Sequence, residues 1–272
     1  MISQSWIKSE EDHLAILESQ KIKPRFGVIL LSGFGQSMCD SDYFMSRIAR
    51  RLHDLEFLTV QADLSGHGDS TGQLEAISLD KLISNIVSVI KMCKETGIDS
   101  WYGVGRGLSA TLLSSVANTF DIKGIVGINP YCLGKEEIIN LWGSTLKENE
   151  HSVNLRKVLS GGPELDKKIA FFGALGSDIE NLLGQHLSCE LLSNLIHYDA
   201  LDAINRFKGN SMYLIPEGDK VAGFESSQWN CSLGERKLDT RRKISFPIDA
   251  IWRHKTIELI VDWFSDHIKN IE

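Results

Sequence analysis

Cysteine is scarce in this chain, and the few cysteines that occur follow no recognisable pattern. The 272 residues contain five of them, and no two have the C-x-x-C spacing of a structural zinc site. They are Cys39, Cys93, Cys132, Cys189 and Cys231. An odd number of scattered cysteines is typical of a reduced protein and not of a disulfide framework. We therefore expect a cytoplasmic protein without a structural metal.

Three further absences narrow the range of partners. No apolar run reaches the roughly 20 residues of a membrane helix, and Met1 to Trp6 lacks the basic and apolar regions of a signal peptide. The formal net charge is -7, so there is no basic surplus with which to neutralise nucleic-acid phosphates. The sequence also lacks a metal-ligand cluster and a G-x-G-x-x-G unit in the right context. We predict no membrane, no nucleic acid and no cofactor.

The first 130 residues alternate between strand and helix patterns. Short unbroken apolar runs, typical of strands buried on both faces, alternate with segments whose apolar residues recur at helical spacing. A hairpin is predicted within 1–23, strands at 26–31, 57–62, 100–104 and 122–130, and helices at 42–55, 79–93 and 110–117. Such alternation predicts an α/β fold with a mostly parallel central sheet, helices on both faces and a ligand site beyond the carboxyl ends of the strands.

The pattern changes between residues 131 and 207. Helical patterns predominate there, and no strand pattern is clear. The predicted helices are 138–146, 152–159, 165–172 and 190–204; strands return at 211–216 and 242–246, before a final helix at 253–268. No repeat or long linker divides the chain. We predict a single domain, residues 1–272, with a helical cap inserted at about 131–207 over the mouth of the site.

The most informative stretch is Asp99 to Ser109, between a strand pattern and a helix pattern. Its glycines at 103 and 107 have the G-x-S-x-G spacing of a nucleophile elbow, the sharp turn that presents a catalytic side chain above a sheet. The central position is Gly105, which has no oxygen or sulfur for covalent catalysis. The sequence predicts the scaffold without its nucleophile. Arg106 follows, as a candidate to hold a substrate carboxylate or phosphate.

Two loops follow the first two predicted parallel strands. In the glycine-rich loop 32–37, the backbone at Phe34, Gly35 and Gln36 can bring N–H groups close to a ligand oxygen, as in half of an oxyanion hole. An ordinary strand-to-helix turn is the alternative interpretation. The loop 63–72 contains His67, and a histidine in such a loop is more often structural than catalytic.

These stretches together resemble the α/β-hydrolase superfamily over about residues 10 to 270. The loop 32–37 is similar to the HGFGxS oxyanion loop with serine for histidine, and 63–70 matches the D-x-x-G-x-G-x-S loop, the most specific of the motifs. Within the superfamily, the stretches 128–131 and 219–225 resemble the exosortase-system-associated hydrolases and the neighbouring serine-aminopeptidase-like group.

The resemblance implies a catalytic triad of which this chain keeps one member. The nucleophile position falls on Gly105, and the acid position after the late strand falls on Asp219. The histidine position before the last helix falls on Asp249, while His254 lies about one helical turn too late. A glycine and an aspartate at these places perform neither the attack nor the proton transfer of the serine mechanism. We therefore do not expect ordinary serine-hydrolase chemistry.

Two functional hypotheses follow. The first is a pseudo-hydrolase that binds a small molecule, an acyl chain or a peptide under its cap, as a receptor, a carrier or the partner of another protein. Its candidate ligand residues are Phe34, Gly35, Gln36, Gly105 and Arg106. The second is an enzyme that uses the carboxylates of Asp219 and Asp249 together with Arg106, in ester, thioester or peptide hydrolysis or in the isomerisation or epimerisation of a peptide.

Other interpretations stay open at this stage. The triad of a working hydrolase can lie at positions other than those assigned here. A displaced nucleophile can come from Ser37, Cys39 or Ser109, although none has a base at a known spacing. Both aspartates also have a structural interpretation. Asp219 can be a carboxylate bonded to loop backbone, and Asp249 can be a cap of the last helix.

Overall fold

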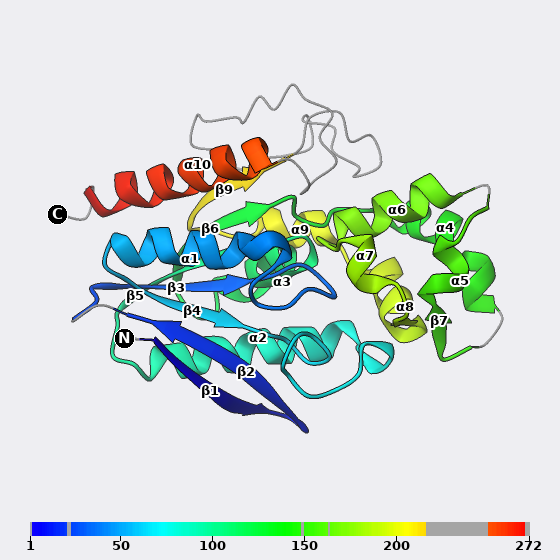
Figure 1. Ribbon diagram of the computed structural model, residues 1–272, viewed down its shortest axis with the longest axis horizontal. Coiled ribbons are helices and arrows are strands. Elements are labelled where there is room, and N and C mark those ends of the chain that lie inside the picture. The colour runs from blue at the N-terminus through cyan, green and yellow to red at the C-terminus, as the bar shows by residue number, and fades with distance from the viewer. Residues whose placement is uncertain (1, 21–22, 148–149, 163, 216–249, 270–272) are drawn as a thin grey trace.

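The computed structural model describes residues 2–20, 23–147, 150–162, 164–215 and 250–269. A seven-stranded sheet with the order β1-β2-β4-β3-β5-β6-β9 forms its centre (Figure 1). Strands β1 and β2 form an antiparallel hairpin, β2 pairs antiparallel with β4, and the remaining pairs are parallel. The strands are β1 (Ile2–Ser9), β2 (Asp12–Ser19), β3 (Phe26–Leu31), β4 (Phe57–Ala62), β5 (Ser100–Arg106), β6 (Ile122–Ile128) and β9 (Asn210–Leu214).

Helices cover both faces of the sheet because the central strands are buried on both sides. In β3, Val28 and Leu30 belong to the apolar cluster of α1 (Phe44–Asp54) and α10 (Ala250–Lys269). Ile29 and Leu31 belong to the cluster of α2 (Leu79–Lys94) and α3 (Leu108–Ala117) on the opposite face. Successive residues of a strand point to opposite faces, so an unbroken apolar run is what this position requires. The predicted α/β architecture is confirmed.

The strand order determines where a site can form. From β3 the chain passes through α1 to β4 on one side, and from β4 it passes through α2 to β5 on the other side of β3. The loops that follow β3 and β5 therefore diverge at the carboxyl ends of two adjacent strands. Such a switch point is where open α/β sheets bind their ligands.

Residues 131–207, which lie between β6 and β9 in the chain, are called the insert below. Most of it lies beyond the carboxyl ends of β3 and β4, and its last helix packs beside α3 (Figure 1). Its elements are α4 (Lys135–Lys147), β7 (Ser152–Asn154), α5 (Leu155–Leu159), α6 (Leu165–Ala174), α7 (Ile179–Leu182), β8 (His186–Ser188), α8 (Cys189–His197) and α9 (Ala200–Asn205). Two short 3-10 helices, Ser41–Tyr43 and Leu74–Ala76, lie outside it.

The insert differs from its prediction at two places. Residues 152–154 were expected to be helical, but they form β7 and pair antiparallel with β8, so the insert contains a small sheet. The predicted helix 190–204 is two helices, because Asp199 begins a new one by accepting the N–H of Asp202 with its side chain. The predicted strand 242–246 lies outside the described residues. Within the described part of the chain, no helix combines the length and hydropathy needed to cross a bilayer.

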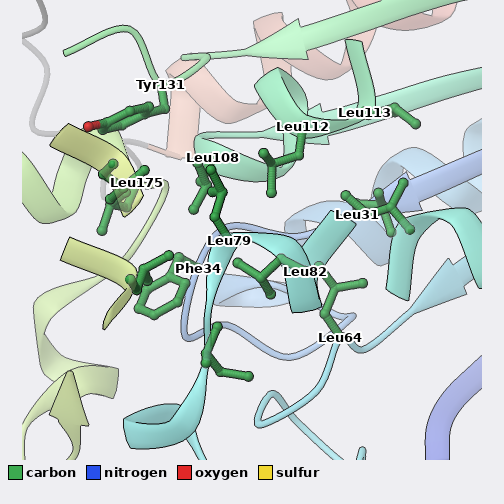
Figure 2. Packing of buried hydrophobic residues seen from close by; sticks show 14 of the residues in the cluster. Leu31, Phe34, Leu64, Leu79, Leu82, Leu108, Leu112, Leu113, Tyr131 and Leu175 are labelled. Carbon is green, nitrogen blue, oxygen red and sulfur yellow. The ribbon is translucent and has the colours of Figure 1, made fainter. Parts of the chain in front are cut away.

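The insert shares one apolar cluster with the sheet. The rings of Trp142, Phe171 and Phe172 pack edge to face, with centroids 5.3 to 6.0 Å apart, and all three side chains are buried. The same cluster continues through Leu175 of the insert to Leu108 of α3 (Figure 2). The burial of apolar side chains from both parts in one cluster therefore stabilises the packing of the insert on the sheet.

Replacement of Trp142 by alanine is expected to lower the free energy of unfolding by about 3–5 kcal/mol, as for other large buried aromatic residues. Because insert and sheet share one cluster, urea unfolding followed by circular dichroism and by fluorescence is expected to give one coincident transition. The Leu183→Ala variant, at an exposed site, is the control, with a change within about 0.5 kcal/mol. An insert that unfolds in a separate, earlier transition would contradict the shared core.

Candidate functional site

The turn from β5 into α3 lies at Gly107, not at Gly105 as the sequence analysis predicted. Strand β5 continues to Arg106, which pairs with Ile128 of β6, and the N–H of Gly107 donates to the Ile128 carbonyl at 2.9 Å. Gly107 has φ 56° and ψ -128°, a strained conformation that suits glycine. Gly105 is instead a strand residue. The sharp turn of the elbow is present, two residues later than the spacing of the glycines suggested.

Gly105 has a packing role in β5. A Cβ at this position would lie 2.5 Å from the Cα of Ala110, so a side chain there would collide with the backbone of α3. The missing side chain lets the helix cross closely over the strand. Gly105 was predicted to contact a ligand, and its closest neighbours are the backbone atoms of Ser109 and Ala110.

One carbonyl of the insert occupies the end of the sheet beside this turn. The Leu175 carbonyl accepts the backbone N–H of Phe34 at 3.0 Å and the backbone N–H of Leu108 at 3.1 Å. Phe34 lies in the loop after β3, and Leu108 follows the residue at the turn. In α/β-hydrolases these two loops supply the N–H groups of the oxyanion hole. Here both N–H groups are bonded to the chain's own backbone.

Three glycines allow this close approach. A Cβ on Gly107 would lie 2.2 Å from the carbonyl carbon of Leu175, and a Cβ on Gly33 would lie 1.9 Å from the carbonyl oxygen of Gly176. Gly176 itself has φ 83°, which an L side chain rarely adopts. The backbones of the β3 loop, the turn and the insert therefore meet where no side chain fits.

Side-chain hydrogen bonds hold the insert on both sides of Leu175. Before it, the Asn129 side-chain N–H donates to the Gly173 carbonyl at 3.1 Å. After it, the Ser177 hydroxyl donates to the Phe34 carbonyl at 2.5 Å. Phe34 thus bonds the insert through both its N–H and its carbonyl, and the contact is fixed in register.

Arg106 forms a buried ion-pair group with two carboxylates. Its guanidinium donates to Asp40, in the loop after β3, and to Asp178 of the insert at 3.2 Å. The Arg106 side chain is 1% exposed. Burial raises the pKa of both aspartates against the opposing effect of the guanidinium, because the buried carboxylates have lost their hydration. Arg106 was predicted to bind a substrate anion, and it binds anions of the chain itself.

The other predicted ligand residues also face the insert. Gln36 is buried, and its side-chain oxygen accepts the Asn181 side-chain N–H at 2.7 Å. A Cβ on Gly35 would lie 2.4 Å from a methyl carbon of Leu182. Phe34 packs edge to face with His67 at 5.3 Å between ring centroids. The structure brings Phe34, Gly35, Gln36 and Arg106 together around the docked insert.

The loop after β4 is held by its own hydrogen bonds. Asp63 accepts the N–H groups of Met38 and of Asp69, the latter at 2.9 Å. Burial raises the pKa of Asp63 to about 6, although both hydrogen bonds act to lower it. The Ser70 hydroxyl donates to the Asp63 carbonyl at 2.8 Å. The most specific sequence motif therefore builds a loop that hydrogen bonds to Asp63 hold in shape.

His67 has the structural role that the sequence analysis favoured. Its Nδ1 lies 2.8 Å from the Ser65 carbonyl, so Nδ1 carries the proton in that bond. Burial lowers the pKa of His67, which keeps the ring neutral. His254, on α10, is exposed.

The remaining candidate catalytic residues differ in their exposure, and two of them lie outside the described part of the chain. Ser109 is buried, and its hydroxyl donates to the Ser32 carbonyl at 2.7 Å, whereas Ser37 is exposed and Cys39 partly exposed. Asp219 and Asp249 lie outside the described residues. Among the described residues, no group of three or more His, Cys, Asp or Glu side chains has the arrangement of a metal site.

The pKa of Asp63 makes the stability of the protein pH dependent. An unfolded aspartate has a pKa of about 4, so between about pH 4 and pH 6 the native state binds the proton more tightly. The contribution of this tighter proton binding to the free energy of unfolding is complete below pH 4 and is lost as the pH rises through 6. Relative to the Asp63→Asn variant, the native protein is expected to lose about 3 kcal/mol of unfolding free energy over this interval.

Urea unfolding of both proteins at pH 4 and at pH 7 measures this difference. The Asp166→Asn variant, at an exposed position of α6, controls for the loss of one carboxylate. An equal difference between the native protein and the Asp63→Asn variant at the two pH values would be incompatible with a raised pKa.

A methyl group at the turn is expected to disturb the docked insert. The Gly107→Ala variant is expected to lose roughly 2–6 kcal/mol of unfolding free energy, since it combines backbone strain with overpacking against Leu175. Gly173 is the matched control, because a Cβ there meets no atom within 4 Å, and Gly173→Ala is expected to gain up to about 1 kcal/mol in its helix. Thermal and urea unfolding measure both; equal stabilities would disprove the close contact.

Comparison with known proteins gives similarity in structure and none in sequence. No family model matches the chain, and no curated protein matches it. Among solved structures, α/β hydrolase domain-containing protein 10 from mouse is similar over 99% of this chain and 100% of its own, with 15% identity and a TM-score of 0.69. Ferulic-acid-bound Est1E from Butyrivibrio proteoclasticus is similar over 97% and 99%, with 16% identity and a TM-score of 0.63. The chain has the α/β-hydrolase fold.

Proposed function

We propose that this protein is a non-hydrolytic protein of the α/β-hydrolase fold that acts by binding. The observation that carries the proposal is the Leu175 carbonyl, which accepts the N–H groups of both Phe34 and Leu108. In hydrolases of this fold, such a pair of donors stabilises the oxyanion that forms from the substrate carbonyl. While the insert is docked, a substrate carbonyl has no pair of donors to bind.

The turn itself supports the same conclusion. Gly107 stands where the strained backbone of the elbow presents its side chain, and glycine supplies no nucleophile. A serine there would need space that the Leu175 backbone occupies, 2.2 Å from the position of its Cβ. The proposal therefore moves the nucleophile position from Gly105 to Gly107, and the position holds glycine in both assignments.

The chemical class of the ligand follows from the group that it must displace beneath the insert, the Leu175 carbonyl. A ligand at this place competes with the Leu175 carbonyl for the N–H groups of Phe34 and Leu108. An acyl group or a peptide carries an oxygen that can replace this carbonyl, and so it suits the site better than an apolar small molecule does. If no ligand displaces the Leu175 carbonyl, the protein acts instead by binding a protein partner while the insert stays in place.

The alternative of an unconventional enzyme has less support. It assigns Arg106 to a substrate anion, and this guanidinium is already bonded to Asp40 and Asp178. Its two proposed catalytic carboxylates, Asp219 and Asp249, lie outside the described residues. No observation among the described residues favours it over the binding role.

We also propose a reducing, cytoplasmic environment. The four described cysteines, Cys39, Cys93, Cys132 and Cys189, are free thiols. Disulfides form and persist mainly in oxidising compartments, so free thiols accord with a cytoplasmic location.

The purified protein is expected to remain unlabelled by a fluorophosphonate probe and to leave a short-chain nitrophenyl ester intact, because the turn offers no nucleophile. Gel fluorescence and absorbance measure the two reactions, with an active serine hydrolase as the positive control.

Stoichiometric labelling of the native protein would overturn the proposal. The variants Ser37→Ala, Cys39→Ala and Ser109→Ala would then identify the residue that reacts. Amide hydrogen exchange gives an independent check, because the N–H groups of Phe34 and Leu108 are expected to exchange slowly while bonded to Leu175. Rapid exchange of both in the folded protein would contradict a closed donor pair.

A further inference from the structure

Strand β1 ends the seven-stranded sheet and has a neighbouring strand on one side only within the described residues. Residues 2–6 of this strand are all exposed. An edge strand presents a row of unpaired N–H and C=O groups, and proteins normally protect such edges with charges, proline or bulges. The stretch from Ile2 to Ile7 contains neither a charged residue nor a proline. This edge lacks the usual protection against pairing.

The hydrogen bonds of β2 identify which groups of β1 point outward. Ala15 faces Trp6 across the hairpin, and its N–H and C=O bond Ser70 and Asp63 at 2.7 and 3.0 Å, away from β1. His13, which faces Lys8, likewise bonds Thr71 through both groups. Facing residues of an antiparallel pair exchange both bonds or neither. The backbone groups of Trp6 and Lys8 therefore point to the open edge.

The alternation extends this result along the strand. Ile2, Gln4, Trp6 and Lys8 share one orientation, with their N–H and C=O groups directed outward and their side chains on one face of the sheet. Ile2 and Trp6 are 73% and 54% exposed, the two largest apolar exposures within β1. They stand symmetrically on either side of Gln4.

We propose that β1 is a dimerisation strand, through which two copies of this chain pair antiparallel about a two-fold axis at Gln4. In this register Ile2 faces Trp6 of the partner subunit, and Gln4 faces Gln4 of the partner subunit. Each facing pair exchanges two N–H···O=C bonds, and both apolar side chains find an apolar partner. The two sheets become one continuous sheet across the dimer.

The sequence of β1 distinguishes this register from its neighbours. A shift by two residues would place Ile2 opposite Lys8 and Gln4 opposite Trp6, so that each apolar side chain faces a polar one. In the proposed register Lys8, the only charged residue of β1, does not face Lys8 of the partner subunit, and no like charges meet between Ile2 and Trp6. A strand that matches itself in this way favours a second copy over a foreign strand, because a two-fold interface uses the same patch on both subunits.

Sedimentation velocity of the full chain from about 1 μM to about 1 mM tests the proposal over the range of weak complexes. The native protein is expected to dimerise. The Gln4→Pro variant removes an outward N–H without disturbing the bonds to β2, and it is expected to raise the dimer Kd at least about 100-fold. Trp6→Lys is expected to do the same, by placing a charge opposite Ile2 of the partner subunit.

Matched variants separate strand pairing from a general loss of apolar surface. Gln4→Ala keeps its N–H, and Leu183→Lys removes an exposed leucine from the insert; both are expected to dimerise as the native protein does. Circular dichroism and Tm verify that all variants fold. A native protein that is monomeric at about 1 mM, or a dimer that survives Gln4→Pro, would overturn the proposal.

A disulfide tests the register directly. Facing residues of a hydrogen-bonded pair have Cα atoms about 5.5 Å apart, within the range that a disulfide spans. The Gln4→Cys variant is therefore expected to cross-link two subunits under mild oxidation, and Lys8→Cys is expected not to, because an axis at Gln4 places the two Lys8 residues far apart along the paired strands. Cross-linking through Lys8→Cys in preference to Gln4→Cys would exclude this register.

Discussion

The arrangement of the candidate site depends on the two hydrogen bonds that the Leu175 carbonyl accepts. They join the β3 loop, the start of α3 and the insert at one point, at the switch point of the sheet where ligands of this architecture bind. The other features of the site depend on that contact. Gly107 has no side chain because the carbonyl lies against it, and the Ser177 hydroxyl fixes the segment that follows. A site of this shape is filled by its own protein.

The charged residues around this contact are buried at an energetic cost. Arg106, Asp40 and Asp178 leave water to meet beneath the insert, and buried ion pairs recover little more than their desolvation. The loop that carries Asp40 is also strained, since Asp40, Asp42 and Tyr43 have φ between 50° and 59°, at a cost of about 1 kcal/mol or more each. Arg253 of α10 pairs with Asp42 of the same loop. We infer that the apolar cluster shared by sheet and insert offsets these costs.

The sequence predicted the architecture better than the site. Unbroken apolar runs such as Phe26–Leu31 specify strands buried on both faces, and their alternation with helical patterns gave the sheet. The turn was misplaced because several glycines in one stretch allow more than one alignment of the elbow, and only the φ of Gly107 distinguishes them. Contact of Leu175 with the β3 loop, about 140 residues away in the chain, leaves no local pattern at all. The finer likeness to exosortase-associated hydrolases stays a prediction.

Gly33, Gly107 and Gly176 meet at backbone distances that admit no side chain, and this has a consequence for how such motifs are interpreted. Glycines beside a catalytic serine let a substrate approach the main chain, and the same glycines let another segment of the protein approach it. A glycine-rich motif therefore records the nearness of two backbones, whatever chemistry accompanies it. In this chain the closely approaching backbone belongs to the Leu175–Gly176 segment of the insert, so these glycines serve the packing of the interior.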